Sequence, residues 1–453
     1  MYANEINLGF IESTSFLLVS LILLIKVGPE IFVGMFYSFS HWRRTITIFG
    51  IAHTYVLLIM MVLALIFYIK KNKGISLPNN NHWIILWVSI WWLWTLFVLT
   101  LYNFESKIIV YRDLLSIVIA PLLFIIIISK DIDRIKRFAF SFVVTSIIGG
   151  FVALDIVNVP FSTLFTDPSI MRFGVLGVGN YHAFSQMFMI SIFFLFTFLL
   201  VSKQTLVRFS LIFASCVCLF FLLLGGSRQS IGGAIPPFLL FLVWAWNLKE
   251  KNKYRVLVLG FLTISLAIFL LNLSPSLVIR NLTHYYAIDT KVDSNFFDAF
   301  NLINDRGALW VKGLKMFLVS PIWGVGYESY FLSHNIFIGL LVNEGIVGFS
   351  FLLGFIVFLR KVTRGFWKGS GNYQFDVWRI ALICIVLYAF VTGMASGTQI
   401  SLWHLWWGGA LLWGLNDLYI LERKKQKKNV NGQLKPSVGV SPKMEMEDKY
   451  ANI

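Results

Sequence analysis

Long, uninterrupted runs of apolar residues recur along most of the chain. We count twelve runs of at least 16 mostly apolar residues, and a membrane-spanning helix needs about 20. Only helices and closed barrels satisfy every backbone hydrogen bond inside lipid, and a barrel would show alternating stretches of about ten residues. The runs therefore predict an all-α polytopic membrane protein. The expected spans are residues 10–27, 45–69, 83–102, 114–129, 138–154, 183–202, 209–226, 231–248, 256–273, 335–359, 380–396 and 402–420.

The composition supports this class, and the distribution of charge predicts an orientation. Charged residues make up 13% of the 453-residue chain, against about 25% in an average soluble protein. The net charge of +16 would point to nucleic acid in a soluble protein. With both termini cytoplasmic, however, 26 of the 38 Lys and Arg residues fall in cytoplasmic segments and 11 in outer ones. This bias follows the positive-inside rule, so we predict that orientation and no nucleic-acid partner.

The same distribution divides the chain into two parts. Residues 1–420 are expected to form a single membrane domain, and residues 421–453 a basic, polar cytoplasmic tail. The Lys-rich start of this tail is typical of a segment that binds lipid headgroups.

Motifs for metals are weak. Cys216, Cys218 and Cys384 all lie inside apolar runs without a CxxC spacing, so they are expected to be core residues and no zinc site is predicted. The acidic pair in Asp131-Ile132-Asp133 resembles the metal-binding DxD motif of nucleotide-sugar transferases. Its basic neighbours favour a solvated charged turn instead. We therefore predict neither a metal nor a cofactor.

Tryptophan concentrates in two clusters, at residues 91–94 and 403–413. Tryptophan is enriched where spans meet the membrane–water interface. Both clusters are therefore expected to belong to an interfacial aromatic belt.

Residues 274–333 form the largest polar segment and are expected outside the membrane, between the ninth and tenth spans. A short helix is predicted here, capped by Asn304 or Asp305 and limited by Pro321. Arg306 shares one face of this helix with Trp310, Gly313 and Phe317, at helical spacing. A turn is expected at residues 324–326.

A few polar residues stand at outer span ends, where chemistry at the membrane surface is conceivable. Arg172, Arg228 and His334 join Arg306 in this group. The planar fork of Arg fits phosphate oxygens, and His, with a pKa of about 6.5, is a natural general base for a sugar hydroxyl. Together they would suit glycosyl transfer from a lipid diphosphate. The alternative is that these Arg residues only snorkel or are solvated, and that His334 caps a helix.

Glu344 lies ten residues after His334, about 15 Å deeper along a helix. A carboxylate inside a span is a functional candidate by default, and we expect it to orient an Arg of the site, such as Arg228. Asn335 is assigned a supporting role beside His334. Gly345 and Gly348 indicate close helix packing.

These residues belong to blocks that resemble a known family. Residues 333–348, SHNIFIGLLVNEGIVG, resemble the signature of the O-antigen ligase and polymerase superfamily. The blocks at residues 172–180, 226–230 and 306–326 resemble three further motifs in the family's order. The resemblance covers roughly residues 170–360, whereas the first 150 residues match only as hydrophobic spans.

The resemblance implies a metal-independent glycosyltransferase with a GT-C-like fold in the bacterial inner membrane. Its site would face the periplasm, its donor would be an undecaprenyl-diphosphate-linked glycan, and its acceptor a glycan lipid. A chain-length regulator is a further candidate partner. By position, His334 carries over as the base and Arg228, Arg306 and Arg172 as diphosphate ligands.

Three functions stay open at this point. A polymerase that extends O-antigen or another surface polysaccharide is favoured over a ligase that moves the glycan onto lipid A–core. The third is a flippase or transporter of lipid-linked sugars. A transporter concentrates polar residues at the bilayer midplane, where this sequence offers only Glu344.

Overall fold

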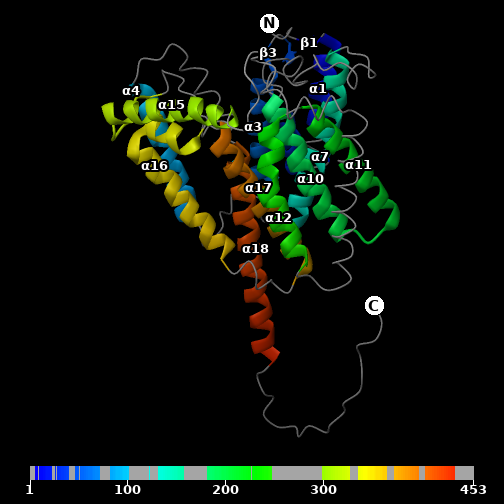
Figure 1. Cartoon of the computed structure of the whole chain (residues 1–453). Coiled ribbons are helices and arrows are strands. Elements are labelled where there is room, and N and C mark those ends of the chain that lie inside the picture. Colours follow the sequence, from blue (N-terminus) through cyan, green and yellow to red (C-terminus); the bar gives the residue numbers. More distant parts are fainter. Residues whose placement is uncertain are drawn as a thin grey trace, which may run out of the picture.

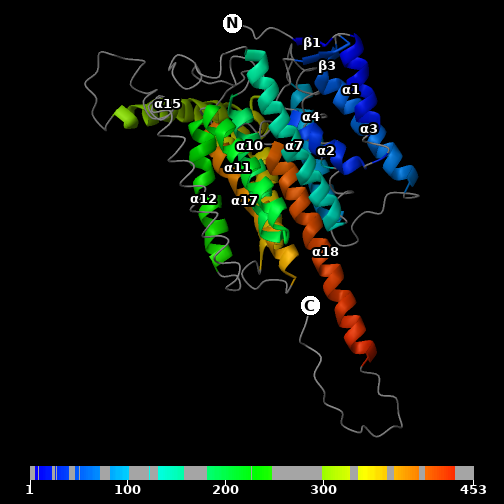
Figure 2. The same cartoon turned by 90° about the vertical axis from the view of Figure 1, so that its right-hand side faces the viewer.

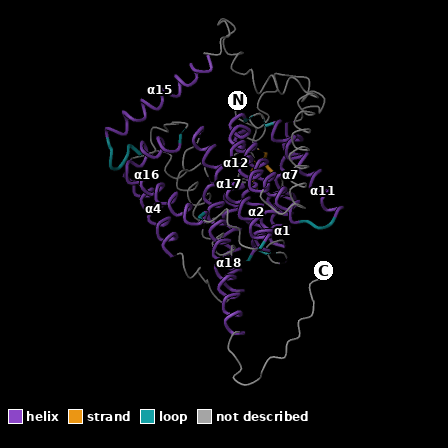
Figure 3. Tube along the Cα trace, turned by 60° about the horizontal axis from the view of Figure 1, so that its bottom comes forward, coloured by secondary structure: helices purple, strands orange, loops and turns teal. Residues whose placement is uncertain are grey.

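The structure is a computed structural model, and it is helical apart from one small sheet in the part of the chain that it describes (Figures 1 and 3). Seven of the described helices are long and apolar enough to cross a membrane. The prediction of an all-α polytopic membrane protein is confirmed for the body of the chain. The described residues are 6–8, 10–22, 26, 28–39, 46–49, 51–71, 82–101, 122, 131–157, 181–225, 227–246, 298–326, 335–364, 372–396 and 403–433.

Each of the seven helices coincides with an expected span. Two more expected spans coincide with α3 (His53–Lys71) and α18 (Trp403–Gln433). The expected spans 114–129 and 256–273 lie outside the described residues, apart from Leu122, so the number twelve stays a prediction. The seven are α4 (His82–Leu101), α7 (Ile132–Val157), α10 (Tyr181–Val201), α11 (Thr205–Leu224), α12 (Arg228–Trp246), α16 (Ile336–Thr363) and α17 (Tyr373–Ser396).

Hydrogen bonds between helix termini define one end of the bundle. Lys136, near the start of α7, donates to Gln374, near the start of α17, at 3.3 Å. Arg379 donates from Nη2 to the carbonyl of Val362, at the end of α16, at 2.7 Å. The long helix α18 projects beyond this end (Figure 1). We call it the tail end, and the opposite one the distal end.

Three spans that matter for function begin at the distal end. The side chain of Gln229, in the first turn of α12, donates to the carbonyl of Thr392, near the end of α17. Since α17 begins at the tail end, α12 begins at the distal end. His182, at the start of α10, contacts Ser227 directly before α12. α16 ends at the tail end, so its first turn is distal as well.

The first residues that the structure describes, 6–8, lie at the distal end, opposite the end from which α18 projects, which corrects the prediction that both termini share one side. Strand β1 (Ile6–Leu8) pairs in parallel with β2 (Ile46–Ile48). β2 pairs with β3 (Ile51–Ala52), which leads directly into α3. α3 ends at the tail end, where Tyr68 accepts a hydrogen bond from Arg134 of α7 at 3.1 Å.

A helical hairpin explains the correction. Within the expected span 10–27, the structure describes α1 (Phe10–Ile22) and, farther on, a helical residue at Lys26. The chain then turns at Gly28, with φ +130°, and returns as α2 (Pro29–Phe39). At the start of α2, the buried Glu30 bonds to Arg137 of α7 at 2.5 Å. Because Arg137 directly follows Lys136 at the tail end, the turn between α1 and α2 lies there too, and the chain is back at the distal end where β2 pairs with β1.

Aromatic side chains fill the centre of the bundle. The ring of Trp407 on α18 contacts Tyr37 of α2 at 5.7 Å and Phe138 of α7 at 5.4 Å between centroids. Trp91 of α4 and Trp406 of α18 meet edge to face at 4.7 Å. These Trp side chains are fully or almost fully buried, so the predicted aromatic belt is wrong for them. Edge-to-face ring pairs and dispersion favour such packing, and lipid offers no hydrophobic force to replace it.

The structure also bears on two smaller predictions, for the cysteines and for the polar tail. Cys218 and Cys384 are fully buried, as expected for core residues, and Cys384 contacts the carbonyl of Pro237 inside α12 at 3.2 Å. The predicted polar tail begins as a continuation of α18, which runs to Gln433. The basic start of the tail is therefore a helical extension of the last expected span.

Candidate functional site

The sequence-predicted site residues that the structure places all lie at the distal end. The backbone of Arg228 opens α12, and that of Arg306 lies within α15 (Asp298–Val319). Asn335 precedes α16. His334 and Arg172 lie outside the described residues.

α15 differs in one respect from the helix expected in the polar segment. It begins at Asp298, so the predicted cap at Asn304 or Asp305 is wrong, because the helix already runs through these positions. It ends at Val319, just before Pro321, as predicted. α15 lies across the distal end of α16 instead of running beside the spans (Figures 1 and 2).

Asn335 caps the helix that follows His334. Its side-chain oxygen accepts hydrogen bonds from the backbone N–H groups of Phe337, at 2.9 Å, and Ile338, at 3.3 Å. Such a cap satisfies donors that the helix itself leaves unpaired and stabilises it by about 1 kcal/mol. Asn335 therefore fixes the start of α16 one residue after the candidate base.

α16 is broken in its middle. Gly345 has φ 67° and ψ −165°, so the helical hydrogen bonds stop there and resume beyond it. This backbone conformation is essentially restricted to glycine. The distal piece of α16, residues 336–344, is therefore a short helix of its own.

A tight turn after α15 satisfies the backbone groups that the break exposes. Val325 donates its N–H to the carbonyl of Val342 at 2.7 Å, and Gly326 donates to Asn343 at 3.1 Å. Beyond the break, Ile346 donates to the carbonyl of Pro321 at 2.9 Å. Buried backbone groups need such partners, so residues 320–326 and 342–346 form one structural unit.

Glycine is required on both sides of this contact. A Cβ on Gly324, whose φ is +73°, would lie 2.5 Å from the carbonyl carbon of Asn343. A Cβ on Gly345 would collide with the carbonyl group of Ile322. The turn predicted at residues 324–326 lies slightly earlier, at residues 321–323, and residues 324–326 directly after it dock on the break.

Glu344 is fully buried beside the break and is held by α4. Its Oε2 accepts a hydrogen bond from Trp91 Nε1 at 3.1 Å, and its Oε1 accepts one from Thr95 Oγ1 at 2.9 Å. Trp94 Nε1 donates to the backbone carbonyl of Glu344 at 3.3 Å. The expected pairing of Glu344 with Arg228 stays a prediction, and these α4 contacts were not expected. Trp91 and Thr95 are four residues apart, a spacing that places them on one helix face.

His182 is a second residue that the sequence interpretation missed. Its Nδ1 lies 2.8 Å from Ser227 Oγ, which lies 2.8 Å from Ser230 Oγ. Ser230 Oγ donates to the backbone carbonyl of His182 at 3.4 Å. These contacts join the starts of α10 and α12 directly beside Arg228. The sequence could have indicated His182 through its position, because this residue lies directly after the family-like block 172–180.

The distal end suits an anionic group. The first turns of α10, α12 and α16 lie there, and a helix N-terminus carries unpaired N–H groups and partial positive charge. Arg228 and Arg306 add formal positive charge at the same end. Phosphates bind readily at such helix starts, so the arrangement favours a phosphorylated substrate.

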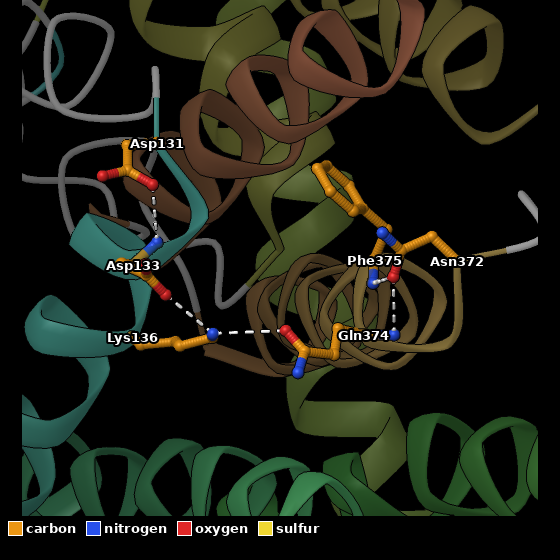
Figure 4. A network of polar contacts seen from close by, with 6 residues as sticks. All are labelled: Asp131, Asp133, Lys136, Asn372, Gln374 and Phe375. Atoms are coloured by element: carbon orange, nitrogen blue, oxygen red, sulfur yellow. Dashed lines mark hydrogen bonds and ion pairs between the residues drawn. The ribbon is translucent and has the colours of Figure 1, made fainter. Parts of the chain in front are cut away.

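The acidic pair near the tail end has a structural role (Figure 4). Asp131 caps α7 by accepting the N–H of Asp133 at 3.0 Å, and Asp133 forms an ion pair with Lys136 at 2.7 Å. Lys136 also bonds to Gln374 of α17. Among the residues that the structure describes, no three His, Cys, Asp or Glu side chains gather into a group that could hold a metal ion. The interpretation as a charged turn accounts for these contacts.

The fold defines a class: a multi-pass helical membrane protein in which several helices begin at one end. Comparison with family models then gives a match to part of the chain. Residues 213–353 match the model described as O-Antigen ligase. The comparison with curated proteins gives no match.

The family match confirms the resemblance to the O-antigen ligase and polymerase superfamily. It begins within α11 and ends within α16. It therefore includes Arg228, α15, the docked turn and the break at Gly345. The match indicates a glycosyltransferase-like membrane enzyme, a glycan ligase or polymerase acting on lipid-linked glycans. α4, which holds Glu344, lies outside the matched region.

Proposed function

We propose that the protein polymerises repeats of O-antigen or another surface polysaccharide on the outer face of the bacterial inner membrane. The donor is an oligosaccharide on undecaprenyl diphosphate, and the acceptor is a second lipid-linked glycan. The main support is the position of the family motifs, because Arg228, Arg306 and Asn335, next to His334, all lie at the distal end.

In the proposed mechanism, Arg228 and Arg306 bind the donor diphosphate, with Arg172 as a further ligand. His334 removes the proton of the acceptor hydroxyl, and the resulting oxygen attacks the anomeric carbon. The C–O bond to the carrier breaks, and undecaprenyl diphosphate leaves with its charge neutralised by the Arg side chains. Direct displacement inverts the anomeric centre, and no metal takes part.

The backbone contacts give this mechanism a physical basis. α15 carries Arg306 and ends in the turn that is bonded to the distal piece of α16. The distal piece begins two residues after His334, directly after its cap Asn335. A diphosphate ligand and the base are therefore mounted on two elements joined by several backbone hydrogen bonds, and such fixed mutual geometry is what catalysis of group transfer requires.

Substitution tests the proposal. His334→Ala, Arg228→Ala and Arg306→Ala should each abolish polymer while the protein stays in the membrane. Matched controls come from the tail end, where His82 begins α4 and the exposed Arg360 lies in the last turn of α16. His82→Ala and Arg360→Ala should leave polymer unchanged. Normal chain lengths from a well-expressed His334→Ala variant would overturn the assignment of the base.

A ligase is the second candidate, because the matching family model is described as O-Antigen ligase. The glycans of a deletion strain separate the two functions. Lipid A–core capped with a single repeat indicates a lost polymerase. Long chains that stay on the carrier lipid indicate a lost ligase.

A further inference from the structure

The described part of α15 presents three different faces, and one of them packs on the protein. Gly313 is buried, and Trp310 and Phe317 are half-buried. The buried face is the one predicted from the sequence, and α15 packs against α16. The other two faces are exposed and differ in chemistry.

The second face is an apolar strip. Val311, Leu314 and Leu318 are 54%, 44% and 72% exposed. At about 100° per residue, these three side chains fall within an arc of about 60° beside the buried face. Three large apolar side chains side by side on a helix surface indicate an interaction site.

The third face is basic. Lys312 and Lys315 are both exposed and follow the apolar strip around the helix, on the side away from Gly313. A helix with an apolar strip beside a row of Lys side chains is typical of a helix that lies in a membrane interface. The Lys stems there reach toward lipid phosphates while the apolar side chains enter the acyl region.

The turn after α15 contacts the exposed apolar surface of a span. Trp323, in the turn after α15, is exposed and stacks on Trp94 of α4 at 5.2 Å between centroids. It also meets Phe97 of α4 at 5.8 Å. Phe97 and Leu101 are exposed on this candidate span. The segment that directly follows α15 therefore packs on the exposed apolar surface of α4.

We propose that α15 binds the phospholipid surface at the distal end. It lies along the interface with Val311, Leu314 and Leu318 among the acyl chains and with Lys312 and Lys315 at the phosphates of anionic lipids. The consequence for catalysis rests on the proposed function: Arg306, on the same helix, is held at the depth of the headgroups, where the diphosphate of a lipid-linked donor lies.

Spin labels on the full-length protein in lipid vesicles test the proposal. Single Cys residues replace Leu314, Leu318 or Lys312 in a Cys216→Ala background, because Cys218 and Cys384 are fully buried. Collision with oxygen, which dissolves in lipid, is compared with collision with a water-soluble nickel complex. Labels at Leu93, on the exposed side of α4, and at Lys203, in an exposed loop, give lipid and water references.

We expect labels at 314 and 318 to collide more with oxygen than with nickel, as at 93, and the label at 312 to show the reverse, as at 203. Equal or greater nickel collision at 314 and 318 would overturn the proposal. Shielding from both reagents would overturn it too, because a protein surface and not lipid would then cover the strip.

A matched pair of variants tests whether this lipid contact affects polymer output. Leu318→Asp places a charge in the apolar strip, which is costly in lipid, and should reduce polymer several-fold at equal protein level. Val319→Asp is the control, because Val319 is 82% exposed but projects between the two Lys side chains, and it should leave polymer unchanged. Equal loss in both variants would contradict the proposed orientation. The spin-label result needs no catalytic activity, so failure of the docking proposal and failure of the proposed function are distinguishable.

Discussion

The distal end contains two junctions built in different ways. The hydroxyl junction consists of His182, Ser227 and Ser230 and joins α10 to α12 through side-chain contacts. The backbone junction consists of residues 320–326 and 342–346 and joins the turn after α15 to the broken α16. One flanks the candidate diphosphate ligand Arg228, and the other supports the helix that follows the candidate base.

The difference concerns how much each junction can adjust. Hydroxyl and imidazole groups rotate, so the hydroxyl junction can follow a bound substrate at small cost. The backbone junction is over-determined, because glycine conformations, main-chain hydrogen bonds and the buried Glu344 all specify the same geometry. We therefore expect substitutions to cost most at the backbone junction and least at the hydroxyl junction.

The largest effect is expected from Gly345→Ala. Its φ of 67° and the contact with Ile322 leave no room for a Cβ, and the strain of such a conformation costs about 1–3 kcal/mol before the clash is counted. The melting temperature in detergent should fall strongly, and polymer should be lost. Gly232→Ala is the matched control, because a Cβ on Gly232 meets nothing within 4 Å. Equal melting temperatures of the two variants would contradict the importance of the break.

Glu344→Ala should rank second. It leaves the buried N–H of Trp91 without its acceptor and removes one of the two acceptors of Thr95. An unsatisfied buried polar group costs about 1–3 kcal/mol. Glu344→Gln keeps the size and one acceptor and should lose less, as measured by the melting temperatures of both variants. If both unfold at the temperature of the unaltered protein, the carboxylate does not fasten α4 to α16.

Trp91→Phe isolates one hydrogen bond of this cluster. The ring contacts with Phe351 and Trp406 are kept, so the loss should be about 1 kcal/mol, the net value of one hydrogen bond. Trp92→Phe is the control, because Trp92 Nε1 has no hydrogen-bond partner among the described residues. A thermal shift as large for Trp92→Phe as for Trp91→Phe would mean that ring volume, not the hydrogen bond, determines the result.

The smallest loss of stability is expected at the hydroxyl junction. Ser227→Ala removes the contacts to His182 and Ser230 and should cost about 0.5–1.5 kcal/mol. Polymer output should fall by a larger factor than this cost suggests, because Ser227 directly precedes Arg228. Ser210→Ala removes an exposed hydroxyl that bonds within its own helix. It should change neither the stability nor the polymer output. If Ser227→Ala leaves the polymer output unchanged, the hydroxyl junction does not influence the candidate site.

Much of the fold could be predicted because membrane insertion depends on local sequence. A run of about 20 apolar residues must form a helix in lipid, and all seven candidate spans coincide with expected ones. The end of α15 before Pro321 was predicted correctly, and the turn near the two glycines was predicted within a few residues, since Gly and Pro act on the backbone locally. The short motifs indicated the family for the same reason.

The tertiary structure decided what depends on partners far away in the sequence. Glu344 receives its hydrogen bonds from Trp91 and Thr95, about 250 positions earlier. The side on which residues 6–8 lie follows from their pairing with residues 46–48, which no hydropathy pattern contains. Composition thus determined that the chain enters the membrane as helices. Long-range contacts alone determined which helix is broken, which Trp side chains are buried, and which end gathers the candidate site.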